Sequence, residues 1–248
     1  MTYKGVEQLM GKSFANREVA DLMFVEYSTK KPFMTFNLAN TTGYDLDGDT
    51  VFAYGGQGHP KRVSFSGNRS GTFRVETQMQ TMQLYQMITG ADLKKDATFL
   101  QREEVKEGAE GALTIAKTPV EGSVHVYKAS DDCGAEVAAT AEGTTVTLTT
   151  PGAEGDAYIV YYLTKLEGVS RLNINTRSFP KAFTIYGETY EKTEDDEIVP
   201  YKMIAYKAVP QSSFSVDFAN DGDPTSLSIT FDLLADADDN VLDLLLEE

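Results

Sequence analysis

Side chains that could perform acid–base, nucleophilic or metal chemistry are sparse in this sequence. His59 and His125 are its only histidines, and no Cys–His cluster has the spacing of metal ligands. A Ser–His–Asp triad would have to use one of these two histidines. His59 lies in the loop-like segment Gly55–Pro60, which lacks the Lys–Ser/Thr pair of a phosphate-binding loop. We therefore expect no catalytic residues, no bound metal and no cofactor.

Two acidic segments, Asp45–Thr50 and Asp236–Asn240, are the remaining candidates for a cation site. In the first segment glycine occupies loop position 4 instead of 6, and position 12 is Gly56 instead of glutamate, so the EF-hand pattern is not met. We expect both segments to be solvated turns, with adventitious cation binding as the alternative. Nothing marks a pair of carboxylates for glycoside hydrolysis among the 38 acidic residues.

The single cysteine and the absence of long apolar runs bear on the compartment. Cys133 cannot form an internal disulfide, and we expect it to be a small, partly buried side chain in a reducing environment. The first seven residues lack the apolar region of a signal peptide, which favours folding in a cytoplasm. No apolar stretch approaches the roughly 18 residues that span a membrane, so no membrane insertion is expected.

The net charge of −16 is concentrated in two blocks of the chain. Residues 208–248 contain ten acidic and no basic side chains, and residues 102–168 contain twelve acidic and five basic ones. A protein that holds nucleic acid by neutralising its phosphates needs the opposite sign. The acidic residues therefore either keep the protein soluble or prevent an anionic molecule from adhering to it.

Period-2 alternation of apolar and polar residues predicts a chain made mainly of β-strands. One expected hairpin joins strands at 62–66 and 72–76 through the turn Gly67–Gly71. A second joins strands at 213–218 and 226–233 through the turn Asn220–Pro224. Each hairpin has one apolar face and one face of hydroxyl and charged side chains, which is typical of an antiparallel sheet with one buried side.

One helix and one inserted block interrupt this β pattern. The apolar stripe of Gln78–Thr89 predicts a helix capped by Gly90, and a shorter helix is possible at 6–10. Residues 102–168 contain short strands separated by frequent turn residues, which suggests a small β-sandwich domain inserted into a frame formed by 1–101 and 169–248. The expected strands of the block are Leu113–Ala116, Ser123–Lys128, Glu136–Thr140, Thr144–Thr149 and Ala157–Thr164.

The order of these segments resembles that of the tail tube (major tail) proteins of long-tailed bacteriophages, especially contractile-tailed ones. The resemblance rests on the hairpin Ser64–Phe73 before the helix, on the aromatic strand Phe183–Tyr190, and on the segment Tyr206–Phe214 before the last hairpin. It covers roughly residues 1–100 and 170–248. It implies a mainly β fold: a β-sandwich or partly closed barrel with one flanking α-helix, to which the block 102–168 adds an Ig-like, outward decoration domain.

The resemblance also implies a function without catalysis. In that family, hexameric rings stack into the inner tail tube of the virion, and the tube conducts double-stranded genomic DNA into the host cell. Assembly would take place in the host cytoplasm, and the partners would be further copies of the chain, the tail sheath, the baseplate and the tail terminator. DNA would pass without specific binding, since acidic and hydroxyl walls repel it weakly.

The resemblance implies that the polar side chains of the two expected hairpins line the tube lumen: Ser64, Ser66, Thr72, Arg74, Glu76, Ser213, Ser215, Asp217, Ser226, Ser228, Thr230 and Asp232. Arg62 and Arg74 depart from a uniformly acidic wall. We expect them to pair with Glu76 or another neighbour, or to lie near the rim of a ring.

Three other classes of protein remain as alternatives. A type VI secretion-like tube protein shares the fold but carries protein cargo. A β-rich adhesin or capsid decoration module would use the inserted block for recognition and would not stack. An enzyme with two carboxylates would need a concave pocket with perturbed acids.

Overall fold

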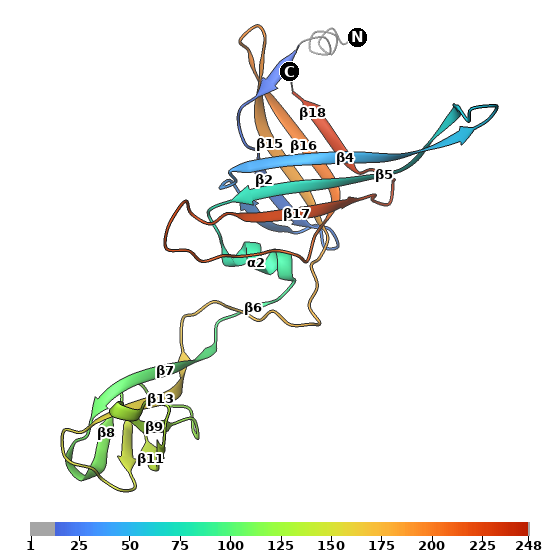
Figure 1. Ribbon diagram of the computed structural model, residues 1–248. Helices are drawn as coiled ribbons and strands as arrows, with labels where there is room; N and C mark the ends of the chain where they lie inside the picture. Colours follow the sequence, from blue (N-terminus) through green and yellow to red (C-terminus); the bar gives the residue numbers. More distant parts are fainter. Residues whose placement is uncertain (1–12, 248) are drawn as a thin grey trace. The chain divides into compact units, whose positions relative to one another are not determined.

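The computed structural model describes residues 13–247, and its secondary structure is mainly β, with one α-helix in the described part of the chain (Figure 1). The chain forms two compact units. One unit combines the described residues up to Asp92 with those from Asn173 onward, and the other runs from Leu93 to Leu172. The prediction of a mainly β protein is confirmed, and the predicted helix at 6–10 lies outside the described residues.

The first unit is built on one antiparallel sheet in the order β3-β2-β15-β16-β17-β5-β4, with β1 beside β15 and β18 beside β16. The strand β16 pairs with β18 through Tyr201–Ala205 and with β17 through Lys207–Pro210, so the sheet divides into two parts along this strand. The path ends at β3 and β4 without closing into a barrel within the described chain. Its strands are β1 (Phe14–Asn16), β2 (Asp21–Glu26), β3 (Pro32–Phe36), β4 (Thr41–Tyr54), β5 (Lys61–Thr77), β15 (Phe183–Thr193), β16 (Ile198–Pro210), β17 (Leu227–Leu234) and β18 (Leu242–Leu246).

The core of this unit lies between the two parts of the sheet and the helix. Alternate residues of β17 are buried, and they pair across the ladder with alternate residues of β5, so that Phe231 lies opposite Phe73. The Phe231 ring also stacks on Phe24 from β2, with ring centroids 5.7 Å apart. Burying each such side chain contributes about 1.5–3 kcal/mol. This burial fixes which face of each strand points inward.

The helix α2 (Met82–Thr89) begins later than the predicted start at Gln78. Thr81 is the N-cap, and its hydroxyl oxygen accepts a hydrogen bond from the Leu84 amide at 3.2 Å. Gly90 ends the helix with φ 65°, and its amide donates to the carbonyl of Gln86. A Cβ at Gly90 would lie 1.9 Å from the carbonyl oxygen of Phe179, so this position requires glycine.

The predicted turn Gly67–Gly71 is wrong, because these residues lie inside the continuous strand β5. The strand β4 pairs with β5 along both of their lengths, and the hairpin turn is instead residues 55–60, which contain His59. Between the pairs Ser66–Thr50 and Arg69–Gly48, two residues of β5 face one residue of β4, which is a β-bulge. A Cβ at Gly67 would lie 3.0 Å from the Cβ of Asp49, so glycine permits the close approach.

Two other predictions in this unit also need correction. Asp45–Thr50 belongs to β4 and is not a solvated turn, whereas Asp236–Asn240 is a turn in which the Asp236 carboxylate accepts hydrogen bonds from two amides. The predicted strand at 213–218 is irregular, and β17 pairs with β16 instead. Phe214 still contributes to the core, since its ring contacts that of Tyr85.

The second unit contains a four-stranded sheet in the order β10-β9-β13-β7, a three-stranded sheet β11-β12-β8, and the short pair β14-β6. Side chains from both larger sheets form one buried cluster around Tyr162, Leu113 and Val146. Four of the five predicted strands of this block recur with shifted ends, whereas the predicted strand Glu136–Thr140 is divided between β10 and β11, which belong to different sheets. The strands are β6 (Leu93–Lys94), β7 (Ala97–Lys106), β8 (Ala112–Thr114), β9 (His125–Lys128), β10 (Glu136–Val137), β11 (Ala139–Glu142), β12 (Thr145–Leu148), β13 (Ala157–Leu166) and β14 (Arg171–Leu172).

Two details of the second unit differ from expectation. The unit begins before residue 102 because β7 pairs with β13 along its whole length, from Ala97 opposite Leu166 to Lys106 opposite Ala157. Cys133 is exposed, not partly buried, since it lies in a turn with φ 59° beside the hydroxyl of Tyr161. In the described part of the chain, no helix has the length and apolar character that a bilayer crossing requires.

Candidate functional site

The structure brings six of the predicted lumen residues together on one face of β17, β5 and β4. Cross-strand pairing forms three rows, which continue onto β4 and are defined here as the polar face: Ser228–Glu76–Thr41, Thr230–Arg74–Gly43 and Asp232–Thr72–Asp45. The side chains of the predicted six are exposed or half-buried, while the residues between them on β5 and β17 are buried. A polar surface three strands wide therefore covers this part of the core.

The register of this face is fixed by the core below it. Shifting β17 by one residue against β5 would turn Ile229 and Phe231 toward solvent, because successive side chains point to opposite faces. The same alternation keeps hydroxyl and charged groups on the outer side. The polar face is thus a direct consequence of the apolar pattern of these strands.

The charges of the polar face are partly balanced. Arg74 forms an ion pair with Asp45 at 2.7 Å, so the prediction that Arg74 pairs with a neighbour is confirmed. Both side chains are exposed, and such a pair contributes about 0–1 kcal/mol. Gln211 donates a hydrogen bond to Asp232 at 2.7 Å. Three carboxylates and one guanidinium leave the face acidic.

Six predicted lumen residues do not join this face. Ser64 and Ser66 pair with Phe52 and Thr50, whereas Thr72 pairs with Asp45. Even- and odd-numbered residues of β4 point to opposite sides, so the bulge places these two serines on the other side of the hairpin. The remaining four precede β17 and lie outside any strand: Ser213, Ser215, Asp217 and Ser226.

Sequence reasoning missed Thr41 and Asp45 as members of the polar face. The residues from Thr41 to Tyr44 show no alternation of burial, and the acidic run that begins at Asp45 suggested a turn. Arg62 was expected to pair with an acidic neighbour or lie near a rim, and its Nε donates instead to the carbonyl of Gly55 at 3.1 Å, within the hairpin turn.

Beyond Gly71, where β5 leaves β17, β4 and β5 continue as a two-stranded extension that contains the bulge and is defined here as the arm (residues 47–54 and 61–70) (Figure 1). β17 pairs with β5 only between Gly71 and Thr77, and β4 is the last strand of the sheet. Both edges of the arm are therefore unpaired within the described chain. Open strand edges are templates for pairing with another chain.

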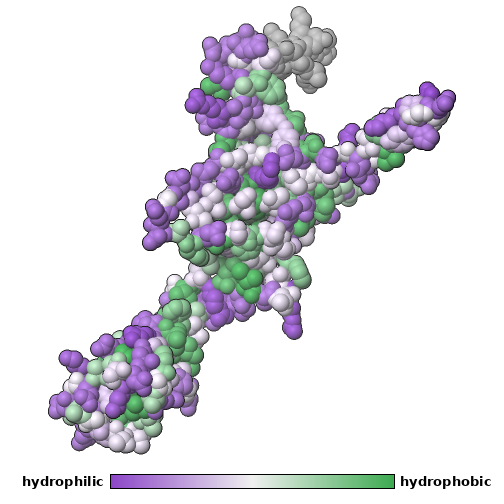
Figure 2. All heavy atoms as spheres, viewed as in Figure 1, coloured by the Kyte–Doolittle hydropathy of each residue, from purple (hydrophilic) through white to green (hydrophobic). Residues whose placement is uncertain are grey.

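The side chains of the arm also suit contact with a partner. Val51 lies directly opposite Phe65, and Ala53 lies opposite Val63, which makes an apolar strip. The Phe65 side chain is 58% exposed. Asp47 and Asp49 lie at the base of the arm, whereas its outer part with the turn (residues 50–69) contains three basic and no acidic side chains. Figure 2 shows hydrophilic residues at the tip of the arm and hydrophobic residues along its length.

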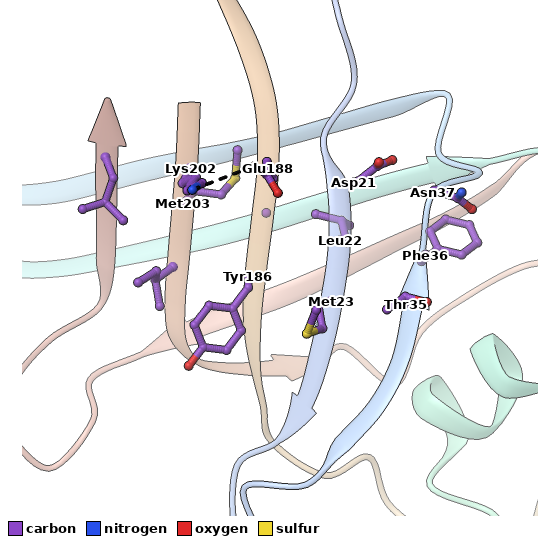
Figure 3. Close-up of a pocket in the computed structure, with 13 residues that line it drawn as sticks. Asp21, Leu22, Met23, Thr35, Phe36, Asn37, Tyr186, Glu188, Lys202 and Met203 are labelled. Carbon is purple, nitrogen blue, oxygen red and sulfur yellow. Dashed lines mark ion pairs between the residues drawn. The ribbon is translucent and has the colours of Figure 1, made fainter. Parts of the chain in front are cut away.

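A groove of about 360 Å³ lies on the outer face of β3, β2, β15, β16 and β18 (Figure 3). Its apolar floor includes Met23 and Tyr186, which are opposite one another on neighbouring strands. At one end lie Asp21, Glu188 and Lys202, with 3.9 Å between the last two side chains. Lys202 also pairs with Glu247, and these contacts raise the pKa of the Lys202 ammonium group.

The described residues contain no group of three or more His, Cys, Asp or Glu side chains placed to hold a metal ion. His125 pairs with Glu136 at 2.7 Å, and Nδ1 of His59 lies 3.4 Å from the carbonyl oxygen of Gly56 in its own turn. The main surfaces of the first unit are therefore a polar face, an arm with open edges and an apolar groove. Each of these surfaces could contact another macromolecule.

The model of the YomU/Tube protein family matches residues 16–245. No curated protein matches the chain.

Proposed function

Because the chain belongs to the YomU/Tube protein family, we propose that it assembles with copies of itself into hexameric rings that stack as the inner tube of a phage tail. The family is one of structural, tube-like phage proteins and not of enzymes. The arm carries this proposal, since its two unpaired edges and exposed apolar strip require a partner in a stable particle.

Self-assembly would cover the apolar floor of the groove as well as the exposed strip of the arm. The apolar floor around Met23 and Tyr186 matches the strip of Val51 and Phe65, and Asp21 offers a carboxylate to the basic tip. We assign the groove of one copy as the acceptor of the arm of the next. Pairing of complementary charges then orients the contact, while burial of the apolar side chains stabilises it.

The polar face is the part of the unit that we assign to the lumen. A basic wall would hold DNA by releasing counterions from the phosphates. Hydroxyl groups with an excess of carboxylates repel the phosphates weakly, and screening limits the repulsion to about 8 Å at physiological salt. DNA would therefore pass close to this surface without binding to it.

The remaining parts of the proposal concern the virion. The tube would form in the host cytoplasm, join the sheath of a contractile tail, the baseplate and the terminator, and release the genome through its lumen. The unit from Leu93 to Leu172 would be a decoration domain on the outside of the tube. An outward position fits its acidic surface, which needs only solvent around it.

Electron microscopy of the purified full chain, with a matched pair of variants, tests the proposal. Wild-type protein should form stacked rings of six, while Phe65→Asp in the arm should abolish stacking and leave a folded chain. Phe99→Asp is the control, because Phe99 is similarly exposed but lies in the second unit.

A wild-type chain that stays a monomer or trimer under all assembly conditions would contradict the proposal and favour a binding module. Loose single rings that never stack would instead favour a secretion-type tube. Unaltered tubes from Phe65→Asp would remove the arm from the assembly contact.

A further inference from the structure

Four basic side chains of the second unit lie where the short β6–β14 pair gives way to the longer β7–β13 ladder: Lys94, Lys95, Lys165 and Arg171. β6 and β14 pair over only two residues, and Arg171 lies directly opposite Lys94. Residues 95–96 separate β6 from β7, and residues 167–170 separate β13 from β14. In the longer ladder of β7 and β13, Lys165 lies opposite Thr98. No ion pair connects any of the four to a carboxylate in the described residues.

The placement of Lys94 directly opposite Arg171 is unfavourable. Like charges directly opposite each other destabilise a strand pair. Arg171 is half-buried, and its Nε is a buried donor with no acceptor in the described chain. Leaving a buried donor of a charged group unsatisfied destabilises the fold, and such groups usually indicate an unseen water or ion.

A pocket of about 430 Å³ lies beside these residues, and Lys95, Lys165 and Arg171 line it together with Thr98. Asp96 and Glu167 also line it, so the charged lining carries one net positive charge. We propose that this pocket binds a phosphate group. The site goes beyond the tube function and does not depend on it.

Phosphate fits this donor set better than a carboxylate does. The guanidinium group supplies a planar fork of N–H donors, and each lysine supplies a separate ammonium group from another element. A tetrahedral oxyanion has enough oxygens to meet all three, and charge-assisted hydrogen bonds of this kind are the strong ones. Asp96 and Glu167 oppose the anion, which limits the expected affinity to a dissociation constant of about 1 mM.

Titration of the full chain with inorganic phosphate, followed by NMR at constant ionic strength with chloride as the balancing anion, tests the site. Wild-type protein should show saturable shifts in the amides of 94–98 and 165–171. Arg171→Gln and Lys165→Gln should each weaken binding about tenfold. Lys128→Gln, an exposed lysine at the end of β9 in the same unit, should leave it unchanged.

Glycerol phosphate separates two sources of the ligand. Binding as tight as that of inorganic phosphate would indicate a phosphate group carried by a larger molecule, and loss of binding would indicate the free ion. If Arg171→Gln fails to fold, the exposed Lys95→Gln and Lys165→Gln variants decide the matter. Shifts that never saturate, or that persist in both lysine variants, would overturn the proposal.

Discussion

At the scale of single residues, the most unusual group in the first unit is the carboxyl of Glu191 on β15. Its side chain is 6% exposed, and its Oε2 has no hydrogen-bond partner in the described chain. Burial raises the pKa of this carboxyl, and a hydrogen bond from Asn16 on the neighbouring β1 partly opposes the rise. The folded protein therefore holds this proton more tightly than the unfolded chain does.

This pKa shift predicts a pH dependence of stability. A raised folded-state pKa stabilises the fold below the ordinary value of 4.5, and the contribution is lost as the pH rises through the raised value. Glu191→Gln should therefore stabilise the protein relative to wild type, and this gain in the free energy of unfolding should be about 1 kcal/mol larger at pH 8 than at pH 5. Urea denaturation at both pH values measures this. Glu188→Gln is the control, because Glu188 is exposed on the same strand. If the free energy of unfolding changes equally between the two pH values in Glu191→Gln and in wild type, the expectation is refuted.

The charge of the polar face gives a second prediction at this scale. Asp232→Lys places an ammonium group in the row with Asp45. If the polar face lines the lumen of the proposed tube, a tube built from this variant should hold DNA more strongly. We expect DNA release to slow several-fold at low salt and to recover as salt is added. The control is Asp217→Lys, since Asp217 carries the same charge outside the polar face. Equal slowing in both variants would show that the position on the face is irrelevant.

At the scale of elements, the arm and the polar face are two halves of one hairpin. The inner half of β5 is covered by β17 and contributes Phe73 and Val75 to the core. The outer half has no such neighbour, and its side chains are exposed on both faces. The bulge at Gly67 marks the change and flips the orientation of alternate residues. One strand pair thus serves the fold at one end and presents a free surface at the other.

The end of α2 provides a stability prediction for an element. Gly90→Ala should lower the free energy of unfolding by about 3 kcal/mol or more, because a left-handed backbone and a clash with Phe179 act together. Gly143→Ala is the matched control, since Gly143 has φ 60° with open space around its Cβ, and it should cost about 1 kcal/mol. Thermal or chemical unfolding compares the two. Equal costs would mean that the contact with Phe179 contributes nothing.

At the scale of the whole molecule, the chain leaves the first unit after Asp92 and returns to it at Asn173. Leu93 and Leu172 are paired partners in the β6–β14 ladder, so the two crossings of the boundary are neighbours. Each unit has its own buried cluster, the larger around Phe231 and the smaller around Tyr162. Separate cores with adjacent connections are typical of units that fold independently.

Removal of the second unit tests that independence. Replacing residues 95–170 with a short Gly-rich linker should leave the first unit folded and able to form tubes, because the linker spans the distance of one strand pair. Circular dichroism, unfolding and electron microscopy would follow the outcome. An unfolded product, or a folded one without tubes, would show that the second unit contributes to the core or to the assembly.

The sequence alone determined the features that depend on local patterns. Period-2 alternation identified the strands of β17 and the inner half of β5. The apolar stripe and Gly90 identified α2, although the helix begins at Met82 and not at the predicted Gln78. The short strands of the second unit were also recognisable, since frequent turn residues bound them. These features depend on the spacing of apolar residues two to four positions apart, which can be read from the sequence alone.

Tertiary structure decided how those segments pair. Gly67–Gly71 has the composition of a turn, yet β4 pairs with β5 on both sides of it, so Gly67 lies in a bulge and Gly71 in the regular ladder opposite Leu46. The alternation at 213–218 has no neighbouring strand to pair with, so Phe214 reaches the core from an irregular segment. The polar face follows from such long-range pairing, because Asp45, Thr72 and Asp232 meet only in the folded sheet.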